Sequence, residues 1–113
     1  MDLLIEIQEN VVVVNMKGNI LGGPDGTLLY ERLNACKDAG QMHVVLNMKD
    51  VAFMNSSGLG MLISGMTTMR NAGGDLRLAN VPDKVRSLLI ITKLNTIFKI
   101  FDSIEDAVAS FDA

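Results

Sequence analysis

The sequence has very few of the residues that build disulfides, metal sites and catalytic relays. Its only cysteine is Cys36 and its only histidine is His43. A lone cysteine cannot form an internal disulfide, and a lone histidine leaves a metal site or a serine relay without the partners it needs. We therefore expect Cys36 to be a small core residue in a reducing, intracellular setting and His43 to be a strand residue. We expect no metal and no cofactor.

Long apolar runs and an excess of positive charge are missing as well. The formal net charge is −3, which argues against nucleic acid and anionic membrane surfaces, because clustered basic residues bind both. No apolar run reaches the ~18–20 residues that cross a bilayer. The first residues, Met1–Glu6, are acidic and lack the basic segment of a signal peptide. These absences favour a cytoplasmic protein.

Hydrophobic residues, in contrast, are plentiful. They make up 49% of the 113 residues, while charged residues make up 20%. A chain of this composition can bury a core and is not expected to be disordered. Its length corresponds to a single domain, residues 1–113.

Short strand-like segments alternate with segments of helical periodicity. Apolar residues that cluster with β-branched neighbours predict strands, and apolar residues spaced three or four apart predict amphipathic helices. The expected strands are Leu3–Ile7, Val11–Met16, Met42–Met48, Asp75–Ala79 and Thr96–Phe101. The expected helices are Thr27–Ala39, Gly58–Asn71, one with Pro82 in its first turn, and one that begins at Ser103.

This order, ββαβαβαβα, predicts an α/β fold. The Glu9–Asn10 turn joins the first two strands as a hairpin. The later strands alternate with helices through short links, so we expect a mixed β-sheet with helices packed against it. Lys49 and Asp50 are expected to end the third strand, leaving Val51–Met54 as a separate apolar segment before the second helix.

Two neighbouring hydroxyl groups stand at the start of the second expected helix. Asn55, Ser56 and Ser57 lie between the apolar segment and the helix, and each of them is a residue type that can form the N-cap. A helix start also accommodates a phosphate, because its N–H groups are unpaired and carry partial positive charge. The residues alone therefore leave two interpretations open, a helix cap and a phosphorylation site.

Other chemistries find no support in this segment. Gly58 and Gly60 leave the backbone of the first turn approachable, but no Gly-Lys-Ser/Thr phosphate loop follows. A nucleophile elbow is missing, and no histidine lies within range for a triad. The glycines of the Gly22–Gly26 loop are typical of an ordinary connecting loop. We therefore do not expect an enzyme.

The same segment resembles the signature of the STAS domain family, and specifically of its stand-alone anti-sigma-factor antagonists. The likeness extends to Gly18, to the stretch Ala72–Leu76 and to the stretch Val85–Leu89, and so along nearly the whole chain. The segment that carries it reads Phe53-Met54-Asn55-Ser56-Ser57-Gly58-Leu59-Gly60.

The resemblance implies a partner-switching protein whose phosphorylation site is Ser56. The unphosphorylated antagonist binds an anti-sigma factor with a histidine-kinase-like ATPase fold, which phosphorylates it, and a PP2C-type phosphatase resets the switch. Ser57 is implied to be better placed to cap the helix, and the Gly22–Gly26 loop is expected to flank the motif. The implied partner-binding motif is Asn55, Ser57, Gly58, Leu59 and Gly60.

One position departs from the family pattern. The family usually has aspartate immediately before the acceptor serine, where this chain has Asn55. Asparagine keeps the size and the turn-forming ability but loses the negative charge, so a kinase that relies on the carboxylate would act slowly or not at all. The alternative function is a non-phosphorylated STAS scaffold in a transport or signalling complex. A small-ligand or nucleotide binder is the third possibility.

Overall fold

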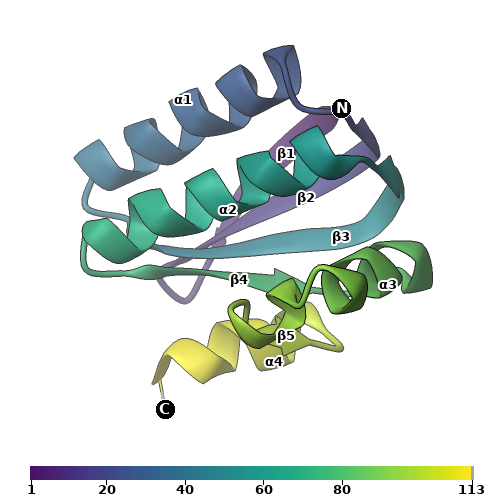
Figure 1. Ribbon diagram of the computed structural model, residues 1–113. Coiled ribbons are helices and arrows are strands. Elements are labelled where there is room, and N and C mark those ends of the chain that lie inside the picture. The colour runs from purple at the N-terminus through teal and green to yellow at the C-terminus, as the bar shows by residue number, and fades with distance from the viewer. Residues whose placement is uncertain (113) are drawn as a thin grey trace.

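The computed structural model describes residues 1–112, whose strands form one sheet with helices on both faces (Figure 1). The strands are β1 (Asp2–Gln8), β2 (Val11–Ile20), β3 (His43–Met54), β4 (Asp75–Ala79) and β5 (Ile100–Phe101), and they lie side by side in chain order. The helices are α1 (Pro24–Asp38), α2 (Ser56–Asn71), α3 (Asp83–Ile91) and α4 (Ile104–Ala109), with short 3-10 helices at Leu94–Thr96 and Ser110–Asp112. The predicted α/β fold with a mixed sheet is confirmed.

The hairpin of β1 and β2 forms as expected. Glu9 and Asn10 have φ values of 50° and 66°, the left-handed values of a type I′ turn, whose twist matches that of two paired strands. β1 is antiparallel to β2, whereas β2, β3, β4 and β5 run parallel to one another. Parallel neighbours need a crossover connection, and α1, α2 and α3 supply these crossovers.

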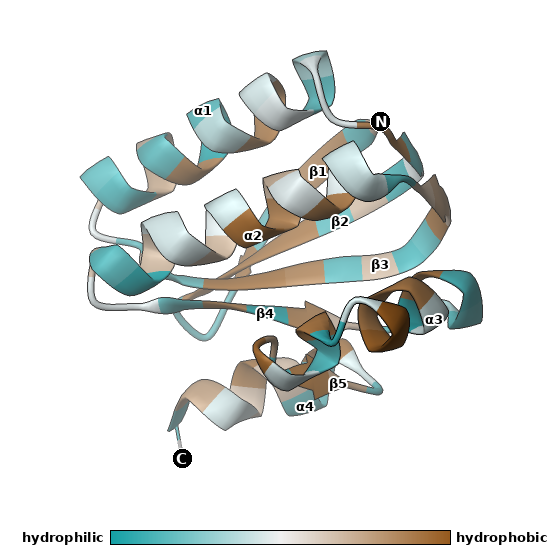
Figure 2. Cartoon of the chain, in the orientation of Figure 1, coloured by the Kyte–Doolittle hydropathy of each residue, from teal (hydrophilic) through white to brown (hydrophobic). Residues whose placement is uncertain are grey.

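One face of the sheet is covered by α1, α2 and α3. Alternate residues of β2, β3 and β4 point to this face and form one apolar cluster with the inward side chains of the three helices. Figure 2 shows hydrophobic colour along much of β2 and β3 beneath these helices. Full burial of one large aliphatic side chain stabilises a fold by about 1.5–3 kcal/mol. The fully buried members include Met16, Leu46, Leu62, Met69 and Leu78.

The opposite face has a smaller apolar cluster beneath α4 and a polar row beside it. Val13 and Val45 belong to this second cluster. In the polar row, Asn47 Nδ2 donates to Asn15 Oδ1 at 2.7 Å, and Asn80 Nδ2 donates to Asn47 Oδ1 at 3.0 Å. Hydrogen bonds between side chains therefore link β2, β3 and the end of β4 on this face.

Two helices begin earlier than the sequence predicts. α1 starts at Pro24, not Thr27, since proline suits the first turn of a helix, where its missing N–H has no partner to lose. α2 starts at Ser56, not Gly58.

Across the described residues, no helix is both long enough and apolar enough to cross a membrane.

The predicted break in the third strand is wrong. β3 runs without interruption from His43 to Met54 and includes Lys49 and Asp50, both exposed. β4 pairs with β3 only as far as Asn47, so the later part of β3 has a single neighbour, β2. Polar side chains are tolerated there, and Lys17 of β2 lies opposite Asp50 with the complementary charge.

The predicted strand Thr96–Phe101 is largely wrong. Only Ile100 and Phe101 pair with β4, opposite Leu78 and Ala79. The residues before them turn instead, because Lys93, two residues after α3, has φ 63° and a 3-10 helix follows it. Apolar residues do alternate along Thr96–Phe101, but β4 pairs with this segment only through its last two residues.

Candidate functional site

The candidate site lies where β3 ends and α2 begins. Met54 is the last residue of β3 and pairs with Ile20, the last residue of β2. Asn55 leaves the sheet with an extended backbone, φ −101° and ψ −178°, and Ser56 is the first residue of α2. The motif therefore lies at the carboxyl end of a parallel strand, the end where open α/β sheets carry their binding residues.

Asn55 is the N-cap of α2 and ties the helix to the sheet. Its Oδ1 accepts a hydrogen bond from the Gly58 N–H at 2.8 Å, and its own N–H donates to the Ile20 carbonyl at 3.3 Å. The expectation that Ser57 is the better placed cap is therefore wrong. A cap residue needs the extended backbone that Asn55 has, whereas Ser57 already lies inside the first helical turn.

Gly58 and Leu59 form the inner side of the first turn. A Cβ atom on Gly58 would collide with the carbonyl oxygen of Ile20, so only glycine lets the helix start lie against the end of β2. Leu59 is buried in the large apolar cluster. These two motif residues hold α2 in place and have no surface to offer a partner.

Ser56, Ser57 and Gly60 form the outer side of the same turn, and all three are exposed. Among the described residues, nothing lies within 4 Å of the position a Cβ on Gly60 would take. Gly22, with φ +80°, packs against Ser57, since a Cβ on Gly22 would lie 2.7 Å from the Ser57 Cβ. The expectation that the Gly22–Gly26 loop flanks the motif is confirmed.

Two exposed apolar side chains beside the motif were not selected from the sequence. Phe53, the residue before Met54 in β3, is 49% exposed, and Leu21, the residue before Gly22, is 47% exposed. Exposed apolar groups that cluster next to a polar site are typical of contact surfaces for proteins. Phe53 lies within the motif segment itself, whereas no sequence signal marks Leu21, whose position follows from the contact between Gly22 and Ser57.

The other end of α2 is held by charged groups. The carboxylate of Asp75 accepts hydrogen bonds from Arg70 Nε at 2.8 Å, from Arg77 Nε at 3.0 Å and from the Leu76 N–H at 2.9 Å. Burial by itself raises the pKa of Asp75, but these three hydrogen bonds outweigh it, so the pKa lies below its ordinary value of 3.8. No pattern in the sequence marks this cluster.

The predicted core role of Cys36 is confirmed. The residue is buried on the inner face of α1, and burial raises the pKa of its thiol. His43 lies at the start of β3 and is exposed, as expected of a strand residue, with its ring stacked on Phe111 at 4.6 Å between centroids.

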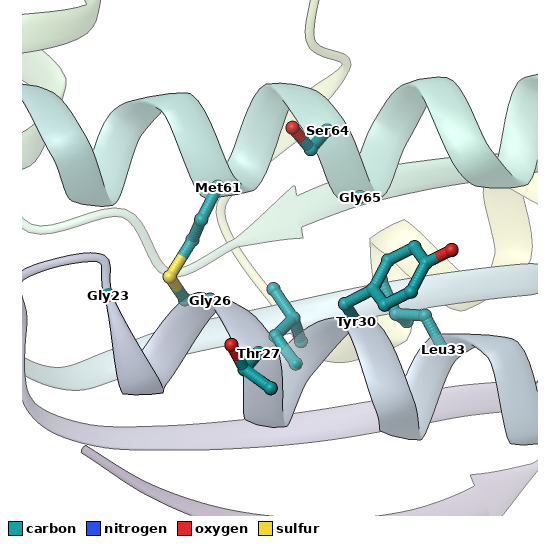
Figure 3. Close-up of a pocket in the computed structure, with 9 residues that line it drawn as sticks. Gly23, Gly26, Thr27, Tyr30, Leu33, Met61, Ser64 and Gly65 are labelled. Atoms are coloured by element: carbon teal, nitrogen blue, oxygen red, sulfur yellow. The ribbon is translucent and has the colours of Figure 1, made fainter.

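A shallow groove of about 370 Å³ runs between α1 and α2 (Figure 3). Met61 of α2 reaches toward Gly26 of α1, while Leu29 and Leu33 lie on its buried side. None of the residues predicted for the site lines this groove. Ser56, Ser57 and Gly60 are instead exposed on the surface of the first turn, which suits contact with a macromolecule better than capture of a small molecule.

Comparison with known proteins places these features in a family. Residues 2–107 match the family model described as STAS domain. The chain is 26% identical over 114 residues to an anti-sigma F factor antagonist of Paenibacillus polymyxa, an alignment that covers 99% of this chain and 97% of that protein. It is 30% identical over 104 residues to an anti-sigma-B factor antagonist of Bacillus subtilis (strain 168), with 92% and 94% covered.

Solved structures share the fold. An anti-sigma factor antagonist from Mycobacterium paratuberculosis has a TM-score of 0.84 at 20% identity, covering 99% of this chain and 94% of that one. The Bacillus cell fate determinant SpoIIAA matches in its unphosphorylated form, with TM-score 0.72, 17% identity and 96% of each chain covered. Its phosphorylated form matches with TM-score 0.74 at 18% identity, covering 96% of this chain and 98% of that one.

Proposed function

Because the chain belongs to the STAS domain family, we propose that it is a stand-alone anti-sigma-factor antagonist that acts as a partner switch in the cytoplasm. It binds an anti-sigma factor while Ser56 is unphosphorylated and is released when Ser56 is phosphorylated. The observation that carries the proposal is the division of tasks at the start of α2. Asn55 caps the helix, so the exposed Ser56 is not needed as the cap. The names of the two relatives support an anti-sigma factor as the partner.

The partner is also the kinase in this proposal. The anti-sigma factor has a histidine-kinase-like ATPase fold and transfers the γ-phosphoryl group of ATP to Ser56 Oγ, which loses its proton while ADP leaves. A PP2C-type phosphatase then hydrolyses the phosphate ester and restores the serine. The chain itself is a substrate and a binding partner, and it is not an enzyme. A fold relative that exists in both phosphorylation states supports this cycle.

The charge of the phosphate is large enough to operate the switch. Phosphoserine carries about −1.5 to −2 charges at neutral pH. At about 6 Å from a carboxylate of the partner, with an effective dielectric constant near 20, each unit charge costs about 3 kcal/mol. Such a cost weakens binding by roughly 100-fold. Negative charge at a helix start does not weaken the helix, so phosphorylation changes binding without unfolding α2.

The contact surface in this proposal combines polar and apolar groups. Ser56 and the open backbone at Gly60 form its centre, and the exposed side chains of Leu21 and Phe53 form its apolar border. Apolar groups supply most of the binding energy of protein interfaces, while the charge at the centre decides between bound and released states.

Phosphorylation in the presence of the cognate anti-sigma factor and ATP tests the site. We expect intact-mass analysis to show one added phosphate, and fragment ions to place it on Ser56. Ser56→Ala should abolish the modification, whereas the matched control Ser57→Ala should retain it, because Ser57 is equally exposed but is not the acceptor. Phosphate on Ser57, Thr67 or Thr68 would show that the assignment is wrong.

Calorimetric titration tests the switch itself. Ser56→Ala should bind the anti-sigma factor constitutively, with the affinity of the unphosphorylated chain. Ser56→Asp should fold normally and bind more weakly, although less so than the phosphorylated chain, because aspartate carries only one charge. Equal affinities of these two variants would remove the electrostatic mechanism.

A non-phosphorylated scaffold in a transport or signalling complex is the second candidate, and the identity of residue 55 favours it. Asn55 lacks the carboxylate that usually precedes the acceptor in this family. Under this function Ser56 stays unmodified beside a kinase that phosphorylates another antagonist, and Asn55→Asp restores modification.

A further inference from the structure

The two edges of the sheet are protected to different degrees. β5 is a short edge of two residues. β1 has seven residues, pairs with β2 without a register shift, and contains neither proline nor lysine. Short length, charged side chains (lysine above all), proline and bulges are the devices that keep edge strands from pairing with other chains, and of these β1 has only the carboxylates of Asp2 and Glu6. Within residues 1–112 no strand pairs with the outer side of β1, so this edge is open to strand addition.

The outer side of β1 offers a regular row of backbone groups. In a type I′ hairpin the residues that flank the turn, Gln8 and Val11, form a hydrogen-bonded pair, and such pairs alternate along the strands. The N–H and C=O groups of Leu3, Ile5 and Ile7 therefore point away from β2. A side-chain contact agrees with this alternation, because Asn15 Nδ2 of β2 donates to the Leu4 carbonyl at 3.3 Å.

Apolar side chains are exposed on both faces of this edge. Leu4 is 70% exposed and Ile7 is 57% exposed. The register with β2 places Leu4 on the face of Asn15, and Ile7 on the opposite face with Val12. A helix laid on the sheet would cover only one of these side chains. An added strand covers both, since its own side chains alternate between the two faces.

We propose that β1 pairs antiparallel with β1 of a second copy of this chain, about a two-fold axis through Ile5. In this register Ile5 faces the partner's Ile5 and Leu3 faces the partner's Ile7, which joins all the outward backbone groups. Leu4 faces the partner's Glu6 and lies diagonal to the partner's Leu4. Each copy presents the same surface to the other, as two-fold symmetry requires.

The carboxylates of β1 select this register over its neighbours. A shift by one residue would bring opposite faces of the two strands together. A shift by two residues in one direction places Glu6 opposite the partner's Asp2, and in the other direction opposite the partner's Glu6. Like charges directly opposite each other destabilise a strand pair. About the axis through Ile5 no carboxylate opposes another, since Asp2 faces the partner's Gln8.

The dimer leaves the phosphorylation surface open and does not depend on the proposed function. Ser56 follows β3, and β2 lies between β3 and the paired edge. The two copies thus form one continuous sheet and carry separate copies of the outer side of α2.

Light scattering and sedimentation over a concentration series test the dimer. We expect the unmodified chain to show a monomer–dimer equilibrium, and Ile7→Lys, which places a charge opposite the partner's Leu3, to weaken it at least about tenfold. The matched control is Ile91→Lys, which changes a side chain that is 79% exposed at the end of α3. It should dimerise like the unmodified chain. Thermal melts establish that every variant folds. A chain that stays monomeric throughout, or an equal loss in the control, overturns the proposal.

Disulfide trapping tests the register. On a Cys36→Ala background, Leu4→Cys and Glu6→Cys are prepared separately and then mixed. Facing residues of a non-hydrogen-bonded antiparallel pair have Cα atoms about 4.5 Å apart, which suits a disulfide. We expect the crosslink between Leu4→Cys and Glu6→Cys to form fastest. Faster crosslinking of either variant with itself would overturn the axis through Ile5, and no crosslink in any mixture would overturn the pairing.

Discussion

The two ends of helix α2 are built in different ways. At the N-terminal end, neutral groups hold the helix in place, because the Asn55 side chain caps it and Gly58 lies against the Ile20 carbonyl. At the C-terminal end, charges do the holding, because Asp75 accepts hydrogen bonds from both Arg70 and Arg77. The first turn of α2 has no acidic side chain, and Ser56, Ser57 and Gly60 on its outer side are uncharged and exposed.

This difference is what a charge-operated switch needs. A phosphate added beside fixed charges would compete with their existing partners and disturb the helix anchor. At the neutral end it meets the partial positive charge of the helix start, and the cap hydrogen bond there is made by Asn55 rather than by Ser56. The ionic anchor, formed by Asp75 with Arg70 and Arg77, lies at the far end of α2. The groups that hold the helix are therefore separate from the surface that switches.

The largest effect is expected from filling the inner side of the neutral end. Gly58→Ala brings a Cβ into the Ile20 carbonyl oxygen, and neither backbone segment can move without disturbing the capped turn. We expect the free energy of unfolding to fall by about 3 kcal/mol, measured by urea denaturation. Gly→Ala stabilises a helix at a position with open space. If the measured fall in unfolding free energy is smaller than that stabilisation, the turn shifts easily to accommodate the methyl group.

Breaking the charged end should have the next largest effect. Asp75→Asn leaves Arg77, whose side chain is 11% exposed, without its anionic partner. We expect unfolding free energy to fall by about 2 kcal/mol at neutral pH, because a nearly buried charge loses its compensation. Asp38→Asn, which removes an exposed carboxylate of α1, is the control and should change stability little.

The same anchor predicts an acid limb in the stability profile. A carboxyl group whose pKa is lowered by folding stabilises the fold above its ordinary value, here 3.8, and loses that contribution as the pH falls through the lower folded value. The difference in unfolding free energy between the unmodified chain and Asp75→Asn should therefore be constant above about pH 5 and become smaller below pH 3.8. A gap that persists at the lowest pH would assign the effect of the substitution to packing.

A smaller and opposite change is expected on the outer side. Gly60→Ala places a methyl group where nothing described lies within 4 Å, so unfolding free energy should rise by about 0.5–1 kcal/mol. If the proposed surface is correct, affinity for the anti-sigma factor should nevertheless fall at least about tenfold. Unchanged affinity in calorimetric titration would remove Gly60 from the contact surface.

The smallest change in stability is expected at the cap. Asn55→Asp keeps the oxygen that accepts from the Gly58 N–H and adds a negative charge at the helix start. We expect unfolding free energy to change by no more than about 0.5 kcal/mol. The rate of Ser56 phosphorylation should change more than the stability does. A marked loss of stability would show that an ionised carboxylate at this half-buried position destabilises the fold.

Local sequence patterns were sufficient for most of the fold. The turn at Glu9 and Asn10, the apolar stripe of α2 and the Ser103 cap of α4 depend on residues close together in the chain, and the structure has all three. The pattern failed where a distant partner decides the outcome. β3 continues through Lys49 because β2 remains alongside it, and most of Thr96–Phe101 lacks a strand to pair with.

The order of the elements, the family resemblance and the place of two serines at a helix start could all be predicted from the residues along the chain. Which polar residue caps that helix, and which glycine is structural, became visible only in the folded chain. Gly58 and Gly60 are alike as sequence signals, yet a Cβ on Gly58 would collide with the Ile20 carbonyl, whereas a Cβ on Gly60 would have no described atom within 4 Å. The reason is physical. A residue's role depends on the atoms packed around it, and here those atoms come from the end of β2, far away along the chain.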